Sequence, residues 1–590
     1  MKPVWWIAAA WLALAASAPA QTLRPASTPP PQPNIVVILV DDAGFTDFQP
    51  YGGEAHMPNI SALAQRGAMF SHYYTSPLCA PSRAMLLTGV DNHRTGVATI
   101  PEVLPPSQQG HHGYTMHLEP GVLTIAQRLR SVGYRTFITG KWHLGHGQGD
   151  LPNDHGFDRS FVLDASGADN WQEAPYMPYN NYAPWFEDGR PAHLPPDFYS
   201  SRFIVDQMMH YLDADHRSGP FFAYIAFQAV HIPVQAPRAY TAHYLDAYTS
   251  GWDAVRLARW RRVQALGLIP QGAPLAPMNA KLKPWTSFSA SEQALYARSM
   301  AVYAGMLEAM DANVGRFIDY LRVHNEADNT IFVVTSDNGP EPSDPVEETG
   351  FTQWMSVHGY TRQVSNLGEI HSYNFIGPEW ASAAASPGDL FKFYAGDGGI
   401  HVPLIIAGPG IGAARINARA FVTDITPTLL DRAGAGPAPA HSVGLDGLSL
   451  SGVLSGAAAQ VRDANTPVGI EVSGNSALFR GDFKLVRNTP RYGDNIWRLY
   501  NISSDPGETH DLARQEPQLF GAMLADYRAY ARANGVVDVP SDYDPQRQTA
   551  RNALMAQLGY YWWALLIAAL VLITIAFFTE RWVRRALAKR

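Results

Sequence analysis

The sequence predicts an α/β fold with a doubly wound, mainly parallel sheet. Short apolar runs without polar interruptions recur along the chain, and helix-like segments separate them. A strand that is buried on both faces has such a continuous apolar run, whereas a strand with one wet face alternates. Strands of the first kind, alternating with helices, favour a parallel sheet sandwiched by helices.

The predicted strands of this sheet are residues 35–40, 134–138, 221–227, 331–335 and 402–406. Helices are expected over residues 59–67, 124–133 and 291–325. Near the C-terminus, residues 478–480, 483–486 and 497–500 are typical of short antiparallel strands, and residues 515–533 of a helix. These predict a second, small α+β domain.

Both ends of the chain carry targeting signals. Lys2, an apolar stretch over residues 4–16 and Ala18-Pro19-Ala20 indicate a signal peptide cleaved near Gln21. An uncleaved anchor is the alternative, but the stretch is too short to span a bilayer. Residues 558–578 are apolar except for Thr574. As a helix they would span roughly 31 Å, which matches a hydrocarbon core of about 30 Å.

The flanks of this second apolar stretch indicate its orientation. Four aromatic residues, 560–563, lie at its start, and the basic residues Arg581, Arg584, Arg585, Lys589 and Arg590 follow its end. Aromatic residues favour the membrane interface, and basic residues favour the cytoplasmic side. The tail is therefore expected in the cytoplasm and the rest of the protein outside. A buried core helix, the alternative, would not need these flanks.

The sequence thus divides into seven expected segments. They are a signal peptide (1–20), a proline-rich linker (21–33), a catalytic α/β domain (34–465), a small antiparallel-sheet-plus-helix domain (466–537), a juxtamembrane spacer (538–557), a transmembrane helix (558–578) and a basic cytoplasmic tail (579–590). The formal net charge is −8, which argues against a nucleic-acid partner. Cys79 is the only cysteine, so no internal disulfide can form.

Polar pairs follow two of the predicted strands. Asp41-Asp42 comes directly after residues 35–40, and Asp337-Asn338 follows residues 331–335. Either pair alone is more often a helix cap or a turn. Two pairs at the carboxyl edge of one open sheet, where such folds bind ligands, instead predict a site for a hard cation such as calcium or magnesium.

Positive groups are expected at the same edge. Lys141 and His143 follow the second predicted strand, and His231 follows the third. A lone lysine or histidine in a loop is usually just solvated. Their shared position beside the carboxylates favours a crevice that binds both a metal and an anion.

The segment Cys79-Ala80-Pro81-Ser82-Arg83 is expected to open a short helix. Pro81 suits an early helical position. The free backbone N–H groups there and the Arg83 guanidinium would attract a negative group near residue 79. A buried structural cysteine is the alternative.

This segment is the complete C-x-P-S-R signature of type I sulfatases, which the chain resembles from residue 34 to about residue 513. Further matching segments are residues 34–42, 57–89, 140–145, 335–341, 499–501 and 505–508. The bacterial arylsulfatases look most similar, through residues 156–161, 252–270 and 377–380 and through Lys392 and Gly398-Gly399.

The resemblance implies an alkaline-phosphatase-like fold and a nucleophile made from Cys79. A separate maturation enzyme would oxidise Cys79 to Cα-formylglycine in the unfolded chain. One hydroxyl of the hydrated aldehyde would attack the sulfur of a sulfate ester, and the second would expel sulfate as the aldehyde re-forms. The expected substrate is a small sulfated ester, with an aryl sulfate favoured over the alternatives, an alkyl or a sugar sulfate. The expected compartment is the periplasmic or extracellular side of a bacterial inner membrane.

The same resemblance assigns roles to the crevice residues. The implied ligands of calcium, or alternatively magnesium, are Asp41, Asp42, Asp337, Asn338 and residue 79. The implied sulfate-binding and proton-transfer residues are Arg83, Lys141, His143, His231 and Lys392. Of these, His143 would support the hydrated aldehyde, and His231 or Lys392 the leaving oxygen. The chain departs from the family at Asp397, usually Glu, and at Val90, commonly Arg.

Two other functions use the same residues. The crevice also suits a hydrolase of phosphate diesters or phosphonate monoesters, and an inactive membrane-anchored protein could merely bind sulfated ligands. Aromatic residues between 161 and 198, including Trp171, Tyr176, Tyr179, Tyr182 and Trp185, could line a pocket for an aryl group or pack a long loop over the core. Packing is the favoured interpretation of these aromatic residues.

Overall fold

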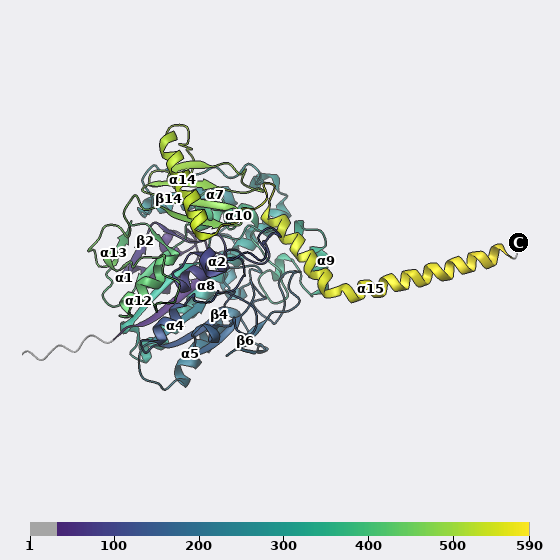
Figure 1. Ribbon diagram of the computed structural model, residues 1–590, viewed down its shortest axis with the longest axis horizontal. Coiled ribbons are helices and arrows are strands. Elements are labelled where there is room, and N and C mark those ends of the chain that lie inside the picture. The colour runs from purple at the N-terminus through teal and green to yellow at the C-terminus, as the bar shows by residue number, and fades with distance from the viewer. Residues whose placement is uncertain (1–31, 589–590) are drawn as a thin grey trace, which may run out of the picture.

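The computed structural model describes residues 32–588, and its core is a ten-stranded sheet (Figure 1). The strand order is β11-β2-β10-β9-β1-β8-β4-β5-β6-β7. The strands are β1 (Asn34–Val40), β2 (Ala68–Phe70), β4 (Arg135–Lys141), β5 (Arg159–Leu163), β6 (Trp185–Glu187), β7 (Arg190–Pro191), β8 (Phe221–Ala226), β9 (Thr330–Ser336), β10 (Leu404–Ala407) and β11 (Ala414–Ile416). The predicted signal peptide, and the linker before Gln32, lie outside the described residues.

The centre of the sheet is parallel. Strands β9, β1, β8, β4 and β5 all run in the same direction. Every residue of β1, β8 and β9 is buried, as continuous apolar runs predict. The predicted mainly parallel fold is therefore confirmed. The strand expected over residues 402–406 forms as β10, which is antiparallel to β9 and β2 and makes the sheet mixed.

Two groups of helices pack around the sheet. One group is α1 (Pro58–Arg66), α5 (Ser200–Ala214) and α8 (Ala290–Val323), and the other is α2 (Cys79–Thr88), α4 (Ile125–Arg130) and α12 (Ile425–Arg432). Helix α8 begins with a capping box in which the Ser289 side chain accepts a hydrogen bond from the Glu292 backbone. The remaining helices of this part are α3 (Asn92–Thr95), α6 (Arg238–Thr241), α7 (Trp252–Ala265), α9 (Phe351–Val357), α10 (Gly377–Ala384), α11 (Asp397–Ile400) and α13 (Ser451–Leu454).

A second, antiparallel sheet lies toward the C-terminus. Its strands are β13 (Val468–Val472), β14 (Asn475–Arg480), β15 (Phe483–Arg487) and β16 (Arg498–Asn501), and α14 (Pro517–Asn534) packs on it. Strand β13 was not predicted from the sequence. A short parallel pair, β3 (Tyr73–Tyr74) with β12 (Ala420–Phe421), contacts this small sheet through the rings of Tyr74 and Phe479.

A buried ion-pair cluster joins the two sheets. Lys484 of β15 places its Nζ 2.7 Å from Asp397 Oδ1 at the start of α11 and 2.7 Å from Glu508 Oε1. All three side chains are almost completely buried. Asp397, one of the two departures from the family pattern, thus holds the small sheet against the large domain.

The last helix, α15 (Pro545–Leu587), has two halves that meet at a kink at Tyr561. In Figure 1 the first half lies against the body of the protein, and the second half runs away from it. Within residues 32–588, α15 is the one helix long and apolar enough to cross a membrane, and none of its most apolar stretch is buried. The expected span lies in the second half. The expected spacer is already helical from Pro545 onward.

Candidate active site

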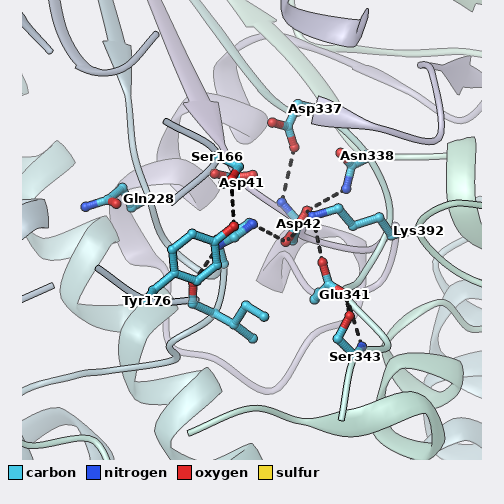
Figure 2. A network of polar contacts seen from close by, with 12 residues as sticks. Asp41, Asp42, Ser166, Tyr176, Gln228, Asp337, Asn338, Glu341, Ser343 and Lys392 are labelled. Carbon is cyan, nitrogen blue, oxygen red and sulfur yellow. Dashed lines mark hydrogen bonds and ion pairs between the residues drawn. The ribbon is translucent and has the colours of Figure 1, made fainter. Parts of the chain in front are cut away.

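The carboxyl ends of the central strands align and bring the predicted polar pairs together. Val40, the last residue of β1, is in register with Ser336, the last residue of β9. Asp42 and Asp337 follow these strands, and the Asp42 backbone N–H donates a 3.2 Å hydrogen bond to Asp337 Oδ1. Figure 2 shows Asp41, Asp42, Asp337 and Asn338 around one point. The two pairs therefore form one cluster, as the sequence predicted.

Cys79 lies at the N-terminus of α2, with only 1% of its surface exposed. The preceding loop is held by Ser82, whose Oγ accepts a 3.0 Å hydrogen bond from the Ser76 backbone. Burial raises the pKa of the Cys79 thiol to about 12 although Lys141 opposes the shift. An unmodified thiol here is consequently neutral at pH 7 and a weak nucleophile.

Arg83 and Lys141 fix the positions of the carboxylates. The Arg83 Nε donates to Asp337 Oδ2 at 2.9 Å, and its Nη1 donates to the Lys141 backbone carbonyl at 2.9 Å. The Lys141 Nζ donates to Asp41 Oδ2 at 2.6 Å. Both cations and both carboxylates are fully buried. Charge pairing makes this burial tolerable, because an isolated buried charge would be costly.

Lys392 reaches the cluster from a distant loop. Its Nζ lies 2.8 Å from Asp42 Oδ1 and 2.8 Å from Glu341 Oε2 (Figure 2). Burial alone would lower the pKa of Lys392, but the facing carboxylates outweigh it and raise the pKa well above the usual range. Lys392 is therefore a protonated, buried ammonium group.

Glu341 is a site residue that the sequence reasoning missed. It follows Asp337 and Asn338 on the same loop after β9, so its position in the chain could have indicated it. Oxygen or nitrogen atoms of Glu341, Asp42 and His231 lie within 4.8 Å of one another. Glu341 thus adds a fourth carboxylate to the three that were predicted.

The two predicted histidines lie near Lys141 and are neutral. His231 Nδ1 donates to the Ile232 carbonyl at 2.6 Å, which leaves Nε2 without a proton, 3.7 Å from Asp42 Oδ2. His143 Nδ1 is buried and has no hydrogen-bond partner within residues 32–588. Burial and the positive charge of Lys141 lower the pKa of both rings well below the ordinary value. Neutral rings can accept a proton or bind a cation.

The donor set fits a hard cation. Carboxylate oxygens of Asp41, Asp42 and Asp337 lie within 4.8 Å of one another. Asp41 Oδ1 and Asn338 Oδ1 are buried, and neither has a hydrogen-bond partner in the described part of the chain. Buried oxygen atoms normally have partners, and calcium or magnesium would provide one. Cys79 Sγ lies within the same 4.8 Å of Asp41 and His231.

A cavity of about 390 Å³ opens above Cys79. His231, Glu341 and Lys392 line it together with Tyr176 and Tyr179. The Tyr176 ring lies 5.3 Å from the His231 ring.

Trp171 and Trp185 of the 161–198 segment pack within the fold instead. Trp171 packs on Tyr199 and Trp185 on Phe161, at 4.5 and 5.2 Å between ring centroids. The loop aromatics thus divide between pocket lining and packing.

Comparison with known proteins identifies the family. The model of the sulfatase family matches residues 33–435. The chain belongs to the sulfatase family. This sulfatase is 34% identical over 533 residues to an uncharacterized sulfatase of Schizosaccharomyces pombe, which covers 87% of this chain and 96% of that protein. It is also 34% identical over 411 residues to an arylsulfatase of Klebsiella aerogenes, covering 69% of this chain and 88% of that one.

Solved sulfatase structures share the fold. A crystal structure of Ps i-CgsB in complex with a neocarrahexaose aligns with a TM-score of 0.61 at 22% identity, over 89% of this chain and 98% of that one. The structure of BT4656 with its substrate D-glucosamine-2-N,6-O-disulfate aligns with a TM-score of 0.57 at 19% identity. The alignment covers 87% of this chain and 100% of that one. At these identities the likeness establishes the architecture of this sulfatase and leaves its substrate open.

Neither departure from the family pattern touches the carboxylate cluster. Val90, the second departure, is buried directly after α2. Its backbone N–H donates a 3.1 Å hydrogen bond to Thr88 Oγ1. Val90 is thus part of the buried core of this sulfatase, whereas Asp397 forms the ion pair with Lys484.

Proposed function

We propose that this sulfatase hydrolyses aryl sulfates with a formylglycine nucleophile made from Cys79. The observation that carries the proposal is the position of Cys79. It lies at the base of the cavity, beside the carboxylate cluster and the buried Lys392. The arylsulfatase of Klebsiella aerogenes among the relatives supports the aryl substrate, as do Tyr176 and Tyr179 along the cavity wall.

Formylglycine would supply the nucleophilic hydroxyl, and a metal would supply the divalent positive charge, that the genetically encoded side chains lack. Hydrated formylglycine at position 79 would offer one hydroxyl to attack sulfur and a second whose deprotonation expels sulfate. Calcium, or alternatively magnesium, would be held by Asp41, Asp42, Asp337, Asn338 and residue 79, and would offset the negative charge of the sulfate oxygens. A maturation enzyme acting on the unfolded chain is implied, because folding buries Cys79.

The chain's own cations hold the anionic group. Lys141 and Arg83 position the carboxylates and add fixed positive charge to the base of the site. Lys392 points its ammonium group into the same space. Preorganised charge of this kind stabilises the transition state because it needs no reorganisation during the reaction.

The protonation states favour Lys392 as the acid for the leaving oxygen. Lys392 is protonated. The neutral His231 ring carries one proton, on Nδ1, and donates it in a hydrogen bond to the Ile232 carbonyl. His231 is then better suited to accept a hydrogen bond than to donate one. His143, whose Nδ1 has no partner among the described residues, would orient the hydroxyls at position 79.

We also propose that the protein is exported and anchored by the second half of α15. The exposed apolar surface of that half supports a single bilayer span, with the catalytic domain outside a bacterial inner membrane and the basic tail in the cytoplasm. Protease treatment of spheroplasts tests this topology. The catalytic domain should be digested, and a C-terminal tag should survive.

Steady-state kinetics on matched esters test the reaction. The purified full chain, matured and supplied with calcium, should hydrolyse 4-nitrophenyl sulfate with a kcat/KM at least about 100-fold above that for the phosphate diester and phosphonate analogues. A higher rate on either phosphorus ester would overturn the proposal. Binding of 4-nitrophenyl sulfate without turnover would instead identify an inactive binding protein.

A further inference from the structure

The large α/β domain does not enclose the active-site cavity alone, because the first half of α15 forms one of its walls. The helix residues that line the cavity are Gln546, Thr549, Ala550, Ala553, Leu554 and Gln557. Their spacing of three and four residues places them on one face of the helix. The segment that leads to the membrane anchor is therefore part of the pocket that contains Cys79.

Hydrogen bonds fix this wall in place. Asn552 Nδ2 donates to the carbonyls of Glu102 and Pro101 at 2.9 and 3.1 Å, and Gln557 Nε2 donates to the Pro178 carbonyl. Before the helix, Tyr543 donates to the Val103 carbonyl at 2.7 Å. Loops on both sides of the cavity thus hold α15, and Glu102 and Pro178 themselves line the cavity.

The cavity is lined by charged and polar groups near Cys79 and includes apolar side chains on α15 and α9. Its inner end holds Cys79, His231 and Lys392, which suit a sulfate group. The lining also includes the apolar side chains of Leu554 on α15 and of Phe351 and Trp354 on α9. Figure 1 shows α9 beside the first half of α15. A ligand with sulfate at the inner end would place its apolar part along these two helices.

The outer end of the cavity lies close to the expected membrane surface. Gln557 lines the cavity and precedes Tyr560 by three residues, which is about 5 Å along a helix. Tyr560 begins the run of aromatic residues that suits a membrane interface. Large apolar side chains are exposed along this part of α15, including Leu554 (59%) and Leu558 (41%).

We propose that the first half of α15 is a specificity wall and that the natural substrate is a sulfated amphiphile taken from the bilayer. Its apolar chain lies between α15 and α9 while its sulfate reaches position 79. This inference rests on the proposed sulfatase reaction at Cys79. It adds that the membrane anchor and the substrate pocket are one structural unit, so the protein acts on esters embedded in the membrane that holds it.

Two substrates with the same reacting group test the wall. The full chain in phosphatidylcholine nanodiscs is assayed with 4-nitrophenyl sulfate and with a nitrophenyl sulfate that carries a hexadecyl chain. The wild-type kcat/KM should be at least about tenfold higher for the hexadecyl ester. Ala553→Trp, which fills the cavity beside α15, should lower the ratio of the hexadecyl to the 4-nitrophenyl kcat/KM by about tenfold.

Matched variants keep this test decisive. Met555→Trp makes a comparable change on the same helix, at a side chain that is 61% exposed and does not line the cavity, and should alter neither rate. Leu554→Asp places a charge on the cavity wall at a side chain that is 59% exposed, where water can still hydrate the charge, and it should repeat the selective loss.

The outcomes separate the two proposals. If wild type does not hydrolyse 4-nitrophenyl sulfate, the proposed function fails. The wall inference is overturned if wild type turns over 4-nitrophenyl sulfate without preferring the hexadecyl ester. It is also overturned if Ala553→Trp and Leu554→Asp lower both substrates equally, or lower neither.

Discussion

The Lys392 Nζ lies 2.8 Å from Asp42 Oδ1, although 350 positions separate the two residues in the chain. Both side chains are almost completely buried. The pair joins the loop before α11 to the exit of β1, and Lys392 lines the cavity that contains Cys79. It gives the sulfatase a fixed ammonium group beside its carboxylate cluster.

Replacement of this ammonium group should slow catalysis. Lys392→Ala should lower kcat on 4-nitrophenyl sulfate by about 10²–10³-fold, because fixed charge aimed at the transition state is lost. The loss should grow as the leaving phenol becomes more basic, since Lys392 is proposed to protonate it. A series of substituted phenyl sulfates measures this dependence. Arg322→Ala, on the exposed surface of α8, is the control, and an equal loss with every leaving group contradicts the acid role.

The Cys79 side chain should be absent as a thiol in active protein. Conversion to formylglycine lowers the mass of the tryptic peptide that contains residue 79 by about 18 Da, which mass spectrometry detects. Cys79→Ala should abolish turnover. Its thermal midpoint should stay within a few degrees of the wild-type value, because the substitution removes only one side-chain atom. Fully active protein with an unmodified thiol is incompatible with the proposed nucleophile.

Chelation should remove both activity and stability. Without a cation, Asp41 Oδ1 and Asn338 Oδ1 keep no partner among the described residues, and carboxylates repel one another. A metal at 100 times its Kd stabilises a protein by about 2.7 kcal/mol, so EDTA should lower the melting temperature by several degrees. Added calcium should restore both properties. Asp41→Asn should bind calcium more weakly by calorimetry, whereas Asp319→Asn on the exposed α8 surface should match wild type.

His93 should make stability depend on pH. Burial opposes its charge, but carboxylates 3.2 Å (Asp91) and 2.7 Å (Glu471) from its two ring nitrogens outweigh burial and raise the pKa of His93 to about 9. The unfolded value is about 6.5. Because the folded pKa is the higher one, the stabilisation is complete below about pH 6.5 and is lost as pH rises through about 9.

The contribution of His93 amounts to about 3 kcal/mol at low pH. His93→Gln should therefore lower the thermal midpoint strongly at pH 6 and little at pH 9.5, in detergent-solubilised full chain. His210→Gln, on the exposed face of α5, should not alter the pH profile. If the thermal midpoint of His93→Gln lies below that of wild type by the same amount from pH 6 to 9.5, a charged His93 ring does not stabilise the fold.

Lys484 should be essential for the junction between the sheets. Lys484→Met leaves Asp397 and Glu508 buried without their cation, which should cost about 3–5 kcal/mol. Calorimetry of the full chain should show a lower unfolding temperature. The control Lys281→Met changes an exposed lysine. Equal unfolding temperatures for the two variants would show that the cluster contributes little.

Much of the fold was predictable because its elements are locally encoded. The buried strands β1, β8 and β9 are continuous apolar runs in the sequence, and the Ser289 capping box marks the start of α8. Strand β13 was missed because five residues beside a loop carry too weak a pattern. The direction of β10 depends on pairing with β9, which periodicity does not encode.

The candidate site divides in the same way. Asp41, Asp42, Asp337 and Asn338 were predictable because each pair directly follows a strand of the sheet. Glu341 was overlooked although it follows Asp337 by four residues on the same loop, and its contact with Lys392 is seen only in the tertiary structure.

The sequence by itself determined the family, through the Cys79 to Arg83 segment, and the apolar helix at the C-terminus. It determined these because a reactive segment and a membrane-length apolar stretch are contiguous in the chain. Only the tertiary structure decided that Lys392 pairs with Asp42 and that α15 walls the cavity above Cys79. Such contacts join segments hundreds of residues apart, and they form when the burial of apolar surface over the whole domain brings those segments together.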